Sequence, residues 1–218
     1  MPPPGTIDDR FATNVPSSTG RVLAEDSSVR NPPVPVSAAD YSRSMSSPAP
    51  LSPNLIPPNL IRLSSPLGDL ELTGDDSEVW SLAIIRQGHL PLEGLPESPN
   101  ALLDQATREL TEYFAGDRVT FDVPVRLSVG TEFQRSVWQG LAAIPFGDHL
   151  SYGELGRSIG KSGAGRAIGG AVGANPAPIL VGCHRVLASN GRITGFSAGE
   201  GIPTKQWLLR HEGIEYVG

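Results

Sequence analysis

The spacing of hydrophobic and polar positions divides the chain into segments of different character. Residues 60–85, LIRLSSPLGDLELTGDDSEVWSLAII, alternate apolar and polar side chains around two turn signals, SPLGD and TGDD. This alternation predicts antiparallel strands. Residues 98–117, SPNALLDQATRELTEYFAGD, carry apolar side chains at helical spacing. We expect a helix there, capped by Ser98, with Pro99 in its first turn and Gly116 at its end.

The segment that follows, 119–127 (VTFDVPVRL), alternates again and predicts a further strand. Residues 59–129 are therefore expected to form a small α/β unit, with an antiparallel sheet and one helix. Residues 1–58 are rich in Pro and Ser and hold few side chains suited to a core, so we expect a disordered tail. The five acidic residues of this tail argue against an organellar transit peptide, and it has no apolar stretch typical of a secretory signal.

Helical spacing dominates residues 130–218. The first two helices of this segment each begin with a capping box. The next is predicted over 164–174, AGRAIGGAVGA, where Asn175 and the proline after it end the helix. It follows its neighbour after a short Gly-containing turn, which is helix-turn-helix spacing. A last helix is predicted in 204–213, TKQWLLRHEG, closed by its glycine. The residues of the two capping boxes are Thr131 with Gln134 and Ser151 with Glu154.

The helix over 164–174 is built from residues that form helices poorly. Each glycine in a helix interior costs about 1 kcal/mol relative to alanine. Close packing against another helix is the ordinary reason to accept that cost. The alternative is entry into a DNA groove, because the minor groove is only ~6 Å wide and excludes bulky side chains. Arg166, the one long side chain of the helix, would then fill the space that an extruded base leaves. The glycines concerned are Gly165, Gly169, Gly170 and Gly173.

Composition and charge narrow the function classes. The net charge of −6 is uneven, with −7 in residues 61–130 and +2 in residues 131–218. Between residues 152 and 192, five basic residues accompany one acidic residue, which suits phosphate contact but also an ordinary solvated helix face. No apolar run approaches the ~18–20 residues of a membrane-spanning helix.

The single cysteine, Cys183, excludes an internal disulfide and a multi-cysteine zinc site. The four histidines lack ligand spacing, so no metal and no other cofactor is expected. A free thiol indicates a reducing compartment, the cytoplasm or, in a eukaryote, the nucleus.

Three stretches carry a family resemblance. Residues 133–160 (FQRSVWQGLAAIPFGDHLSYGELGRSIG), 166–186 (RAIGGAVGANPAPILVGCHRV) and 204–213 (TKQWLLRHEG) resemble the O6-alkylguanine-DNA alkyltransferases. These proteins move an alkyl group from guanine O6 onto their own cysteine. The resemblance covers about residues 60–216. It implies an α/β N-terminal subdomain over 59–129 and a mostly helical, winged-helix-like DNA-binding and active-site domain over 130–218.

The resemblance also implies the catalytic residues. Cys183 would be the nucleophile that attacks the alkyl carbon as a thiolate. Because a free thiol has a pKa of about 8.5, it is mostly protonated at neutral pH and needs a base. His184 would be that base, acting through a bound water, and Glu212 would polarise its imidazole. This is the nucleophile, base and orienting group that covalent catalysis requires. Tyr152 would assist protonation of the leaving guanine at N3. Arg185 is expected to be a structural ion-pair partner.

The remaining expected contacts concern the flipped base and the duplex. The substrate is expected to be double-stranded DNA containing O6-alkylguanine, with O4-alkylthymine as a further candidate. We expect the protein to act as a monomer and to have no membrane partner. Asn175 corresponds to the family asparagine that links the recognition helix to the active-site strand. The backbones of Val181 and Cys183, together with Ser197, would recognise the base, beside Phe196. The residues expected to contact DNA are Arg166, Ala167, Gly170, Ala171 and Tyr152.

The sequence departs from the family pattern at three places near the thiol. Gly182 stands where the family usually has Pro, which predicts a less rigid backbone before the nucleophile. Phe196 stands where many members have Tyr. Ala198 replaces the first of two usual glycines, and the loop before Lys205 is about two residues longer. The resemblance implies that these positions touch the pocket wall, so they bear on the range of alkyl groups accepted.

Three other functions compete with alkyl transfer. A non-enzymatic relative would bind alkylated DNA without accepting the alkyl group, but such proteins lack the cysteine. A helix-turn-helix regulator would have no need for the CHRV sequence or for Glu212. A cysteine hydrolase would leave the small-residue helix without a purpose. Transfer of label from an O6-methylguanine oligonucleotide to the protein would separate these functions.

Overall fold

The computed structural model describes residues 57–218, so the predicted tail over 1–58 lies almost wholly outside the described residues. The first half of the described chain contains the predicted sheet. Its strands are β1 (Asn59–Ser65), β2 (Gly68–Gly74) and β3 (Val79–Ile84), paired antiparallel in chain order. Both turn signals connect adjacent strands, as the alternation predicted.

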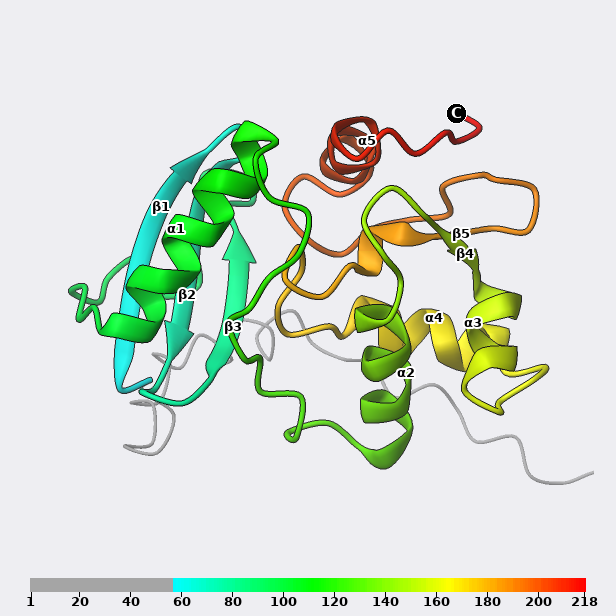
Figure 1. The fold of residues 1–218 in the computed structure, drawn as a ribbon, viewed down its shortest axis with the longest axis horizontal. Coiled ribbons are helices and arrows are strands. Elements are labelled where there is room, and N and C mark those ends of the chain that lie inside the picture. The colour runs from blue at the N-terminus through cyan, green and yellow to red at the C-terminus, as the bar shows by residue number, and fades with distance from the viewer. Residues whose placement is uncertain (1–56) are drawn as a thin grey trace, which may run out of the picture. The chain divides into compact units, whose positions relative to one another are not determined.

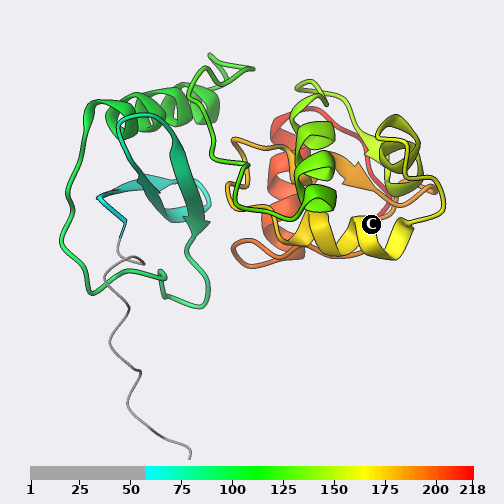
Figure 2. The same cartoon turned by 90° about the horizontal axis from the view of Figure 1, so that it is seen from below.

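Helix α1 (Ala101–Ala115) lies across one face of this sheet (Figures 1 and 2). Its start differs from the prediction: Asn100 caps it, not Ser98, because the Asn100 side chain accepts a hydrogen bond from the backbone N–H of Leu103. Ser98 instead exchanges backbone hydrogen bonds with Leu60 of β1. The predicted end is confirmed, since Gly116 caps the helix with a φ of 84°, a left-handed conformation that glycine adopts readily.

The strand predicted over 119–127 is wrong. Within the described residues, this segment forms only an isolated bridge to the start of β3, where Val79 donates to Pro124 O and Arg126 donates to Val79 O. Pro124 has no N–H, and the N–H groups of Asp122 and Val123 donate to Glu109 instead. With its donors used elsewhere, the segment cannot continue a strand ladder.

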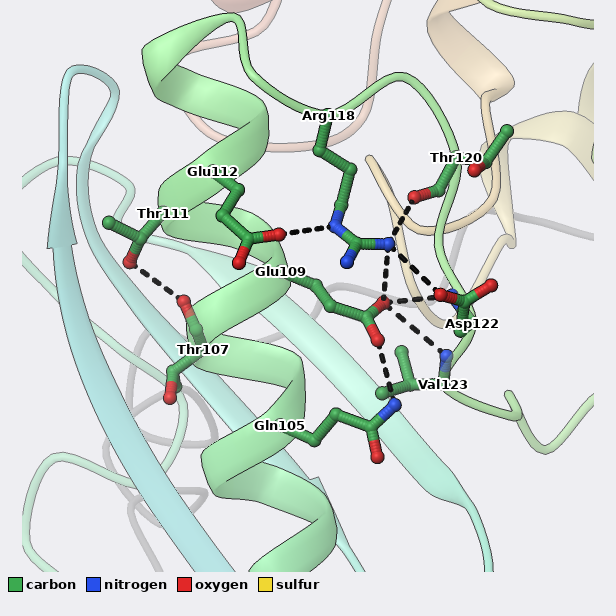
Figure 3. Close-up of polar contacts among 9 residues, drawn as sticks. All are labelled: Gln105, Thr107, Glu109, Thr111, Glu112, Arg118, Thr120, Asp122 and Val123. Carbon is green, nitrogen blue, oxygen red and sulfur yellow. Dashed lines mark hydrogen bonds and ion pairs between the residues drawn. The ribbon is translucent and has the colours of Figure 1, made fainter.

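Glu109 and Arg118 hold this segment against α1 (Figure 3). The Glu109 side chain is buried and accepts hydrogen bonds from the side chain of Gln105 at 2.7 Å and from Asp122 N at 2.8 Å. Arg118 donates to Glu112 at 2.7 Å and to Asp122 at 3.1 Å. The segment therefore follows the helix through side-chain contacts rather than through sheet pairing.

The second half of the described chain is mostly helical, as predicted. Helices α2 (Glu132–Ala142) and α3 (Tyr152–Ser158) begin with the predicted capping boxes, and both reciprocal hydrogen bonds of each box are present. Helix α4 (Gly165–Gly173) follows α3 in helix-turn-helix order, and α5 (Ile202–His211) closes the domain before Gly213. Within residues 57–218, no helix has the length and apolar composition needed to cross a bilayer.

A short parallel strand pair in this domain was not predicted. Strand β4 (Leu150–Ser151), just before α3, pairs with β5 (Val186–Leu187), just after the cysteine. Two residues each are too few to produce an alternation in the sequence. The pairing nevertheless connects the start of the helix-turn-helix to the segment that carries the thiol.

The two halves of the described chain both contribute to one of its three hydrophobic clusters, which we call the shared core. Residues from the end of α4 onward reach the sheet: Ala177, Ile179 and Leu208 pack in the same cluster as the sheet and α1. In addition, Leu82 N of β3 donates to Pro176 O. The sheet and α1 thus support the segment that leads to Cys183. The other buried members of the cluster are Leu70, Leu72, Val79, Leu82, Ile84, Leu103, Ala106, Leu110, Tyr113 and Val123.

We expect Glu109→Ala to destabilise the protein by about 2–3 kcal/mol, because it leaves backbone donors at Asp122 and Val123 without their partner. Glu112→Ala is the matched control. It removes an exposed partner of the same Arg118, and such ion pairs contribute about 0–1 kcal/mol. Denaturant unfolding at equilibrium measures both values. Equal losses in the two variants would contradict the role given to Glu109.

Candidate active site

The chain between α4 and the cysteine is held in an unusual conformation. The Asn175 side chain donates to Val181 O at 2.9 Å and accepts from Ala177 N at 3.1 Å, so it ties the end of α4 to the residues before Cys183. Ile179, between them, has a φ of 76°, which is rare and costly for a β-branched residue. Its buried side chain in the shared core offsets this cost. The sequence contains no local signal for such a conformation.

The thiol of Cys183 lies at the inner end of a pocket and is almost fully buried, with 3% of the residue exposed. Burial raises the pKa of this thiol. A hydrogen bond from Asn175 and the positive charge of Lys205 act in the opposite direction without cancelling the effect. The resting state at neutral pH is therefore a protonated thiol, which is a poor nucleophile until a base accepts its proton.

His184 and Glu212, expected from the sequence to be the base and its partner, are in direct contact. His184 Nε2 lies 2.8 Å from Glu212 Oε1, and both side chains are fully buried. Burial raises the pKa of Glu212, but hydrogen bonds from His184 and Arg185 outweigh this effect and lower the pKa to about 2. An ionised carboxylate can only accept, so Nε2 carries the proton and donates.

The other imidazole nitrogen is the one that can act as a base. His184 Nδ1 is buried and has no hydrogen-bond partner among residues 57–218. Burial lowers the pKa of His184 below its ordinary value of 6.5, although Glu212 opposes this change. The imidazole is therefore neutral at pH 7 and presents a lone pair at Nδ1, as a general base must.

Arg185 has the structural role expected of it. Its guanidinium donates to both oxygens of Glu212, at 2.7 and 2.9 Å, and to Ile144 O at 2.7 Å. The arginine side chain also lies over Gly182, where an added Cβ would come within 2.8 Å of Arg185 Cδ. Gly182 itself has a φ of −70°, within the range that proline imposes. The glycine thus adopts a proline-like angle and admits the arginine beside it.

The pocket that Cys183 lines has a volume of about 570 Å³. Its other lining residues come from α3, from α4 and from the chain after β5. Tyr152 lies at the start of α3, and its hydroxyl accepts a hydrogen bond from Thr194 at 3.3 Å. Ser197 donates to Gly173 O at the end of α4, at 2.8 Å. Phe196 lies between these residues in the wall loop, which we define as residues 194–201. Val181 does not line the pocket but is buried, and its carbonyl accepts the hydrogen bond from Asn175.

The wall loop is held from outside by the sheet. Gln87, in the turn after β3, has a φ of 52°, and its N–H donates to Glu200 at 2.6 Å. Arg86 donates to Ser197 O at 3.4 Å. Ala198, in place of a usual glycine, packs against the shared core, so the longer loop is anchored on the α/β subdomain.

Lys205 is a pocket residue that the sequence interpretation missed. Only 1% of this lysine is exposed, and its ammonium group donates to Val186 O at 2.6 Å. Burial lowers the pKa of Lys205 to about 8, even though the neighbouring Cys183 acts to raise it. An ammonium group in the pocket favours the thiolate over the thiol. The sequence offers one signal for its burial: Lys205 lies on the same side of the last helix as the apolar Leu208 and Leu209.

The glycines of α4 do not serve helix packing. A Cβ added at Gly165 or Gly170 would meet nothing within 4 Å, and one at Gly169 would only approach the Tyr152 ring at 3.9 Å. By contrast, a Cβ at Gly156 of α3 would come within 2.7 Å of Ile168. Close packing therefore explains the glycine in α3 but not those in α4.

The exposed face of α4 carries most of the residues expected to contact DNA. Arg166, Ala167 and Gly170 are exposed on this face. Ala171 is not: only 3% of it is exposed, and it packs in the helical core. Arg166 takes part in none of the ion pairs within residues 57–218, so the structure gives it no partner in the fold.

Comparison with known families identifies both halves of the described chain. Residues 61–127 match the "6-O-methylguanine DNA methyltransferase, ribonuclease-like domain", and residues 132–214 match the "6-O-methylguanine DNA methyltransferase, DNA binding domain".

Individual relatives carry a name of the same family. The chain is 43% identical over 151 residues to a methylated-DNA–protein-cysteine methyltransferase of Mycolicibacterium paratuberculosis, covering 69% of this chain and 89% of that relative. A protein of the same name from Methanosarcina acetivorans is 40% identical over 152 residues, covering 68% and 94%.

Solved structures are similar as well. The crystal structure of Mycobacterium tuberculosis O6-methylguanine methyltransferase has a TM-score of 0.62 at 38% identity, covering 71% of this chain and 92% of that one. The M. tuberculosis OGT structure in complex with DNA has a TM-score of 0.61 at 40% identity, covering 69% and 90%.

We expect His184→Gln to slow the reaction of Cys183 with iodoacetamide by about 10- to 100-fold at pH 7, because the thiol is protonated and loses its base. The loss should shrink at pH 9.5, where hydroxide removes the proton directly. Intact-mass spectrometry follows the single thiol. His149→Gln, at an exposed histidine, is the control and should behave as wild type. An equal loss at both pH values would exclude His184 as the base.

Proposed function

The chain belongs to the methylated-DNA–protein-cysteine methyltransferase family, and on this premise we propose that it repairs DNA by direct reversal, moving an alkyl group from guanine O6 to Cys183. The observation that carries the proposal is the arrangement at the inner end of the pocket. A single thiol lines the pocket, the next residue along the chain is a neutral imidazole with a free lone pair, and this imidazole is oriented by a buried carboxylate.

The proposed reaction is an in-line displacement at the alkyl carbon. The Cys183 sulfur forms a bond to this carbon as the bond between the carbon and O6 breaks, and the electron pair of that bond moves onto guanine. The thiol proton passes to His184 Nδ1, through a bound water as the family resemblance implies. Guanine takes up a proton as it leaves, for which Tyr152 is the proposed assistant. The product is a thioether, so each molecule reacts once.

The substrate must leave the duplex to reach this thiol. A base inside a stacked helix cannot approach a buried cysteine, so an enzyme that acts on it must extrude it first. The exposed, side-chain-poor face of α4 fits a narrow groove, and Arg166 is free to occupy the vacated stack. The pocket then receives the base between Tyr152, Phe196 and Ser197.

We propose O6-alkylguanine in double-stranded DNA as the substrate, with O4-alkylthymine as a further candidate. The proposed active species is a monomer, since one protein accepts one alkyl group. The free thiol requires a reducing compartment, which favours the cytoplasm or, in a eukaryotic cell, the nucleus. Among the competing functions, a regulator or a non-enzymatic DNA-binding protein gives no reason to build a base and carboxylate beside a thiol.

Cys183→Ser should abolish alkyl transfer while DNA binding persists, because a hydroxyl is a far weaker nucleophile and the proposed groove contacts lie on α4. Incubation with an excess of a duplex containing O6-methylguanine should add one methyl group to the wild type in intact-mass spectrometry, and none to the variant. A mobility-shift assay reports binding. Methyl transfer to the serine variant would remove Cys183 from the mechanism.

Arg166→Ala should slow repair of duplex DNA at least ~10-fold more than it slows reaction with the free O6-alkylguanine base. Extruding a base costs a few kcal/mol, and a side chain that fills the stack lowers this cost only where a stack exists. Second-order inactivation rates with both substrates measure the difference. Arg210→Ala, at an exposed arginine of α5, is the control. Equal losses with both substrates would exclude the base-extrusion role.

A further inference from the structure

A tyrosine of the α/β subdomain reaches the catalytic carboxylate. Tyr113, in the last turn of α1, is completely buried, and its hydroxyl donates to Glu212 Oε1 at 2.8 Å. The same oxygen accepts the proton of His184 Nε2, also at 2.8 Å. Within residues 57–218, the other donors to Glu212 are His184 and Arg185, the two residues that follow Cys183. Tyr113 is thus the one donor to this carboxylate that the α/β subdomain supplies.

Packing fixes the position of the Tyr113 hydroxyl. Its ring contacts Phe121, with centroids 5.4 Å apart, and Phe146, at 6.1 Å, and meets His211 edge-on at 4.8 Å. The backbone carbonyl of Tyr113 accepts a hydrogen bond from His211 Nε2 at 2.7 Å. Two adjacent residues at the end of α5, His211 and Glu212, therefore bind the same tyrosine, one through its backbone and one through its hydroxyl.

The hydroxyl has to act as a donor. Burial, followed by the nearby charge of Glu212, raises the pKa of Tyr113 far above its ordinary value, so the phenol keeps its proton throughout the physiological range. A hydrogen bond donated to a carboxylate stabilises its negative charge and weakens its attraction for other protons. Three donors share Oε1, and two of them, Tyr113 and Arg185, reduce the pull of the carboxylate on the His184 proton.

We propose that Tyr113 is a positioning residue of the transfer reaction, which holds the Glu212 carboxylate against His184 and limits the basicity of that imidazole. The inference rests on the proposed alkyl transfer. It gives the α/β subdomain a part in the chemistry, because a helix packed on the sheet sets the strength of the base that activates the thiol.

The groups around His184 are few enough for a pH profile to be informative. Glu212, the C-cap of α5, and Lys205 of α5 act on it, Arg185 acts on it from its own turn, and Tyr113 acts through Glu212 from α1. His211 faces Tyr113 rather than His184. Protonation of His184 at low pH removes the base, so the transfer rate falls through the pKa of this imidazole, which burial places below 6.5.

Tyr113→Phe removes the hydroxyl and keeps the ring. The carboxylate then holds the imidazolium more strongly, and the acid limb of the single-turnover transfer rate should move to higher pH by about 0.5–1 unit. The substrate is a duplex containing O6-methylguanine, in excess, between pH 4.5 and 8. Affinity for unmodified DNA should not change. Tyr216→Phe is the matched control, because among residues 57–218 its hydroxyl accepts a hydrogen bond from the exposed Arg210 alone, and its profile should match wild type.

A second variant keeps the experiment decisive if the first unfolds. Site-specific 3,5-difluorotyrosine at position 113 preserves the packing but donates a stronger hydrogen bond, so the acid limb should move to lower pH. A uniform rate loss at every pH, with an unshifted limb in both variants, would overturn the proposal and leave Tyr113 a packing residue. Absence of transfer by the wild type would instead refute the proposed function itself.

Discussion

A carboxylate buried in a protein persists only where its charge is compensated and its oxygens accept hydrogen bonds. Glu212 meets this condition with donors from His184, Arg185 and Tyr113. Through Arg185 the same network holds Ile144 O, at the end of α2. The hydrogen bonds around this one carboxylate thus link α1, the residue that follows α5, the turn that contains Cys183 and, through Arg185, the chain just after α2. The geometry of the base follows from it, since an ionised Glu212 directs the Nε2 proton and leaves Nδ1 free.

Glycine serves two opposite purposes within the helical domain. In α2 and α3 it admits neighbouring side chains, as at Gly140 and Gly156, where an added Cβ would collide with Leu155 or Ile168. In α4 a Cβ added at Gly165 or Gly170 would meet nothing within 4 Å, so packing within the described residues does not account for the low bulk there. The helix remains folded because its inner residues are buried and because Trp138 donates to Ala171 O. An intrinsically weak helix can therefore present a smooth face.

The sequence predicted those features whose causes are local. Helix starts with capping boxes, the turns of the sheet and the Gly116 cap follow from a few adjacent residues, and each was found. Ser98 and Asn100 are both residue types that cap helices, and the sequence alone did not show which of the two lies at the start of α1. The structure gives Asn100. The predicted strand at 119–127 failed because Glu109, distant in sequence, takes its N–H groups. Lys205 and Tyr113 were missed for the same reason, since their partners lie far along the chain.

The conformation of Ile179 joins the local stability of the site to that of the sheet. Its strained backbone lies four residues before the thiol, while its side chain packs with β3 and α1. The active-site segment therefore cannot open on its own without exposing part of the sheet core, so local opening near the thiol is coupled to loosening of the sheet. The segment between Asn175 and Leu187 gains protection from this packing, although it contains no long helix or strand.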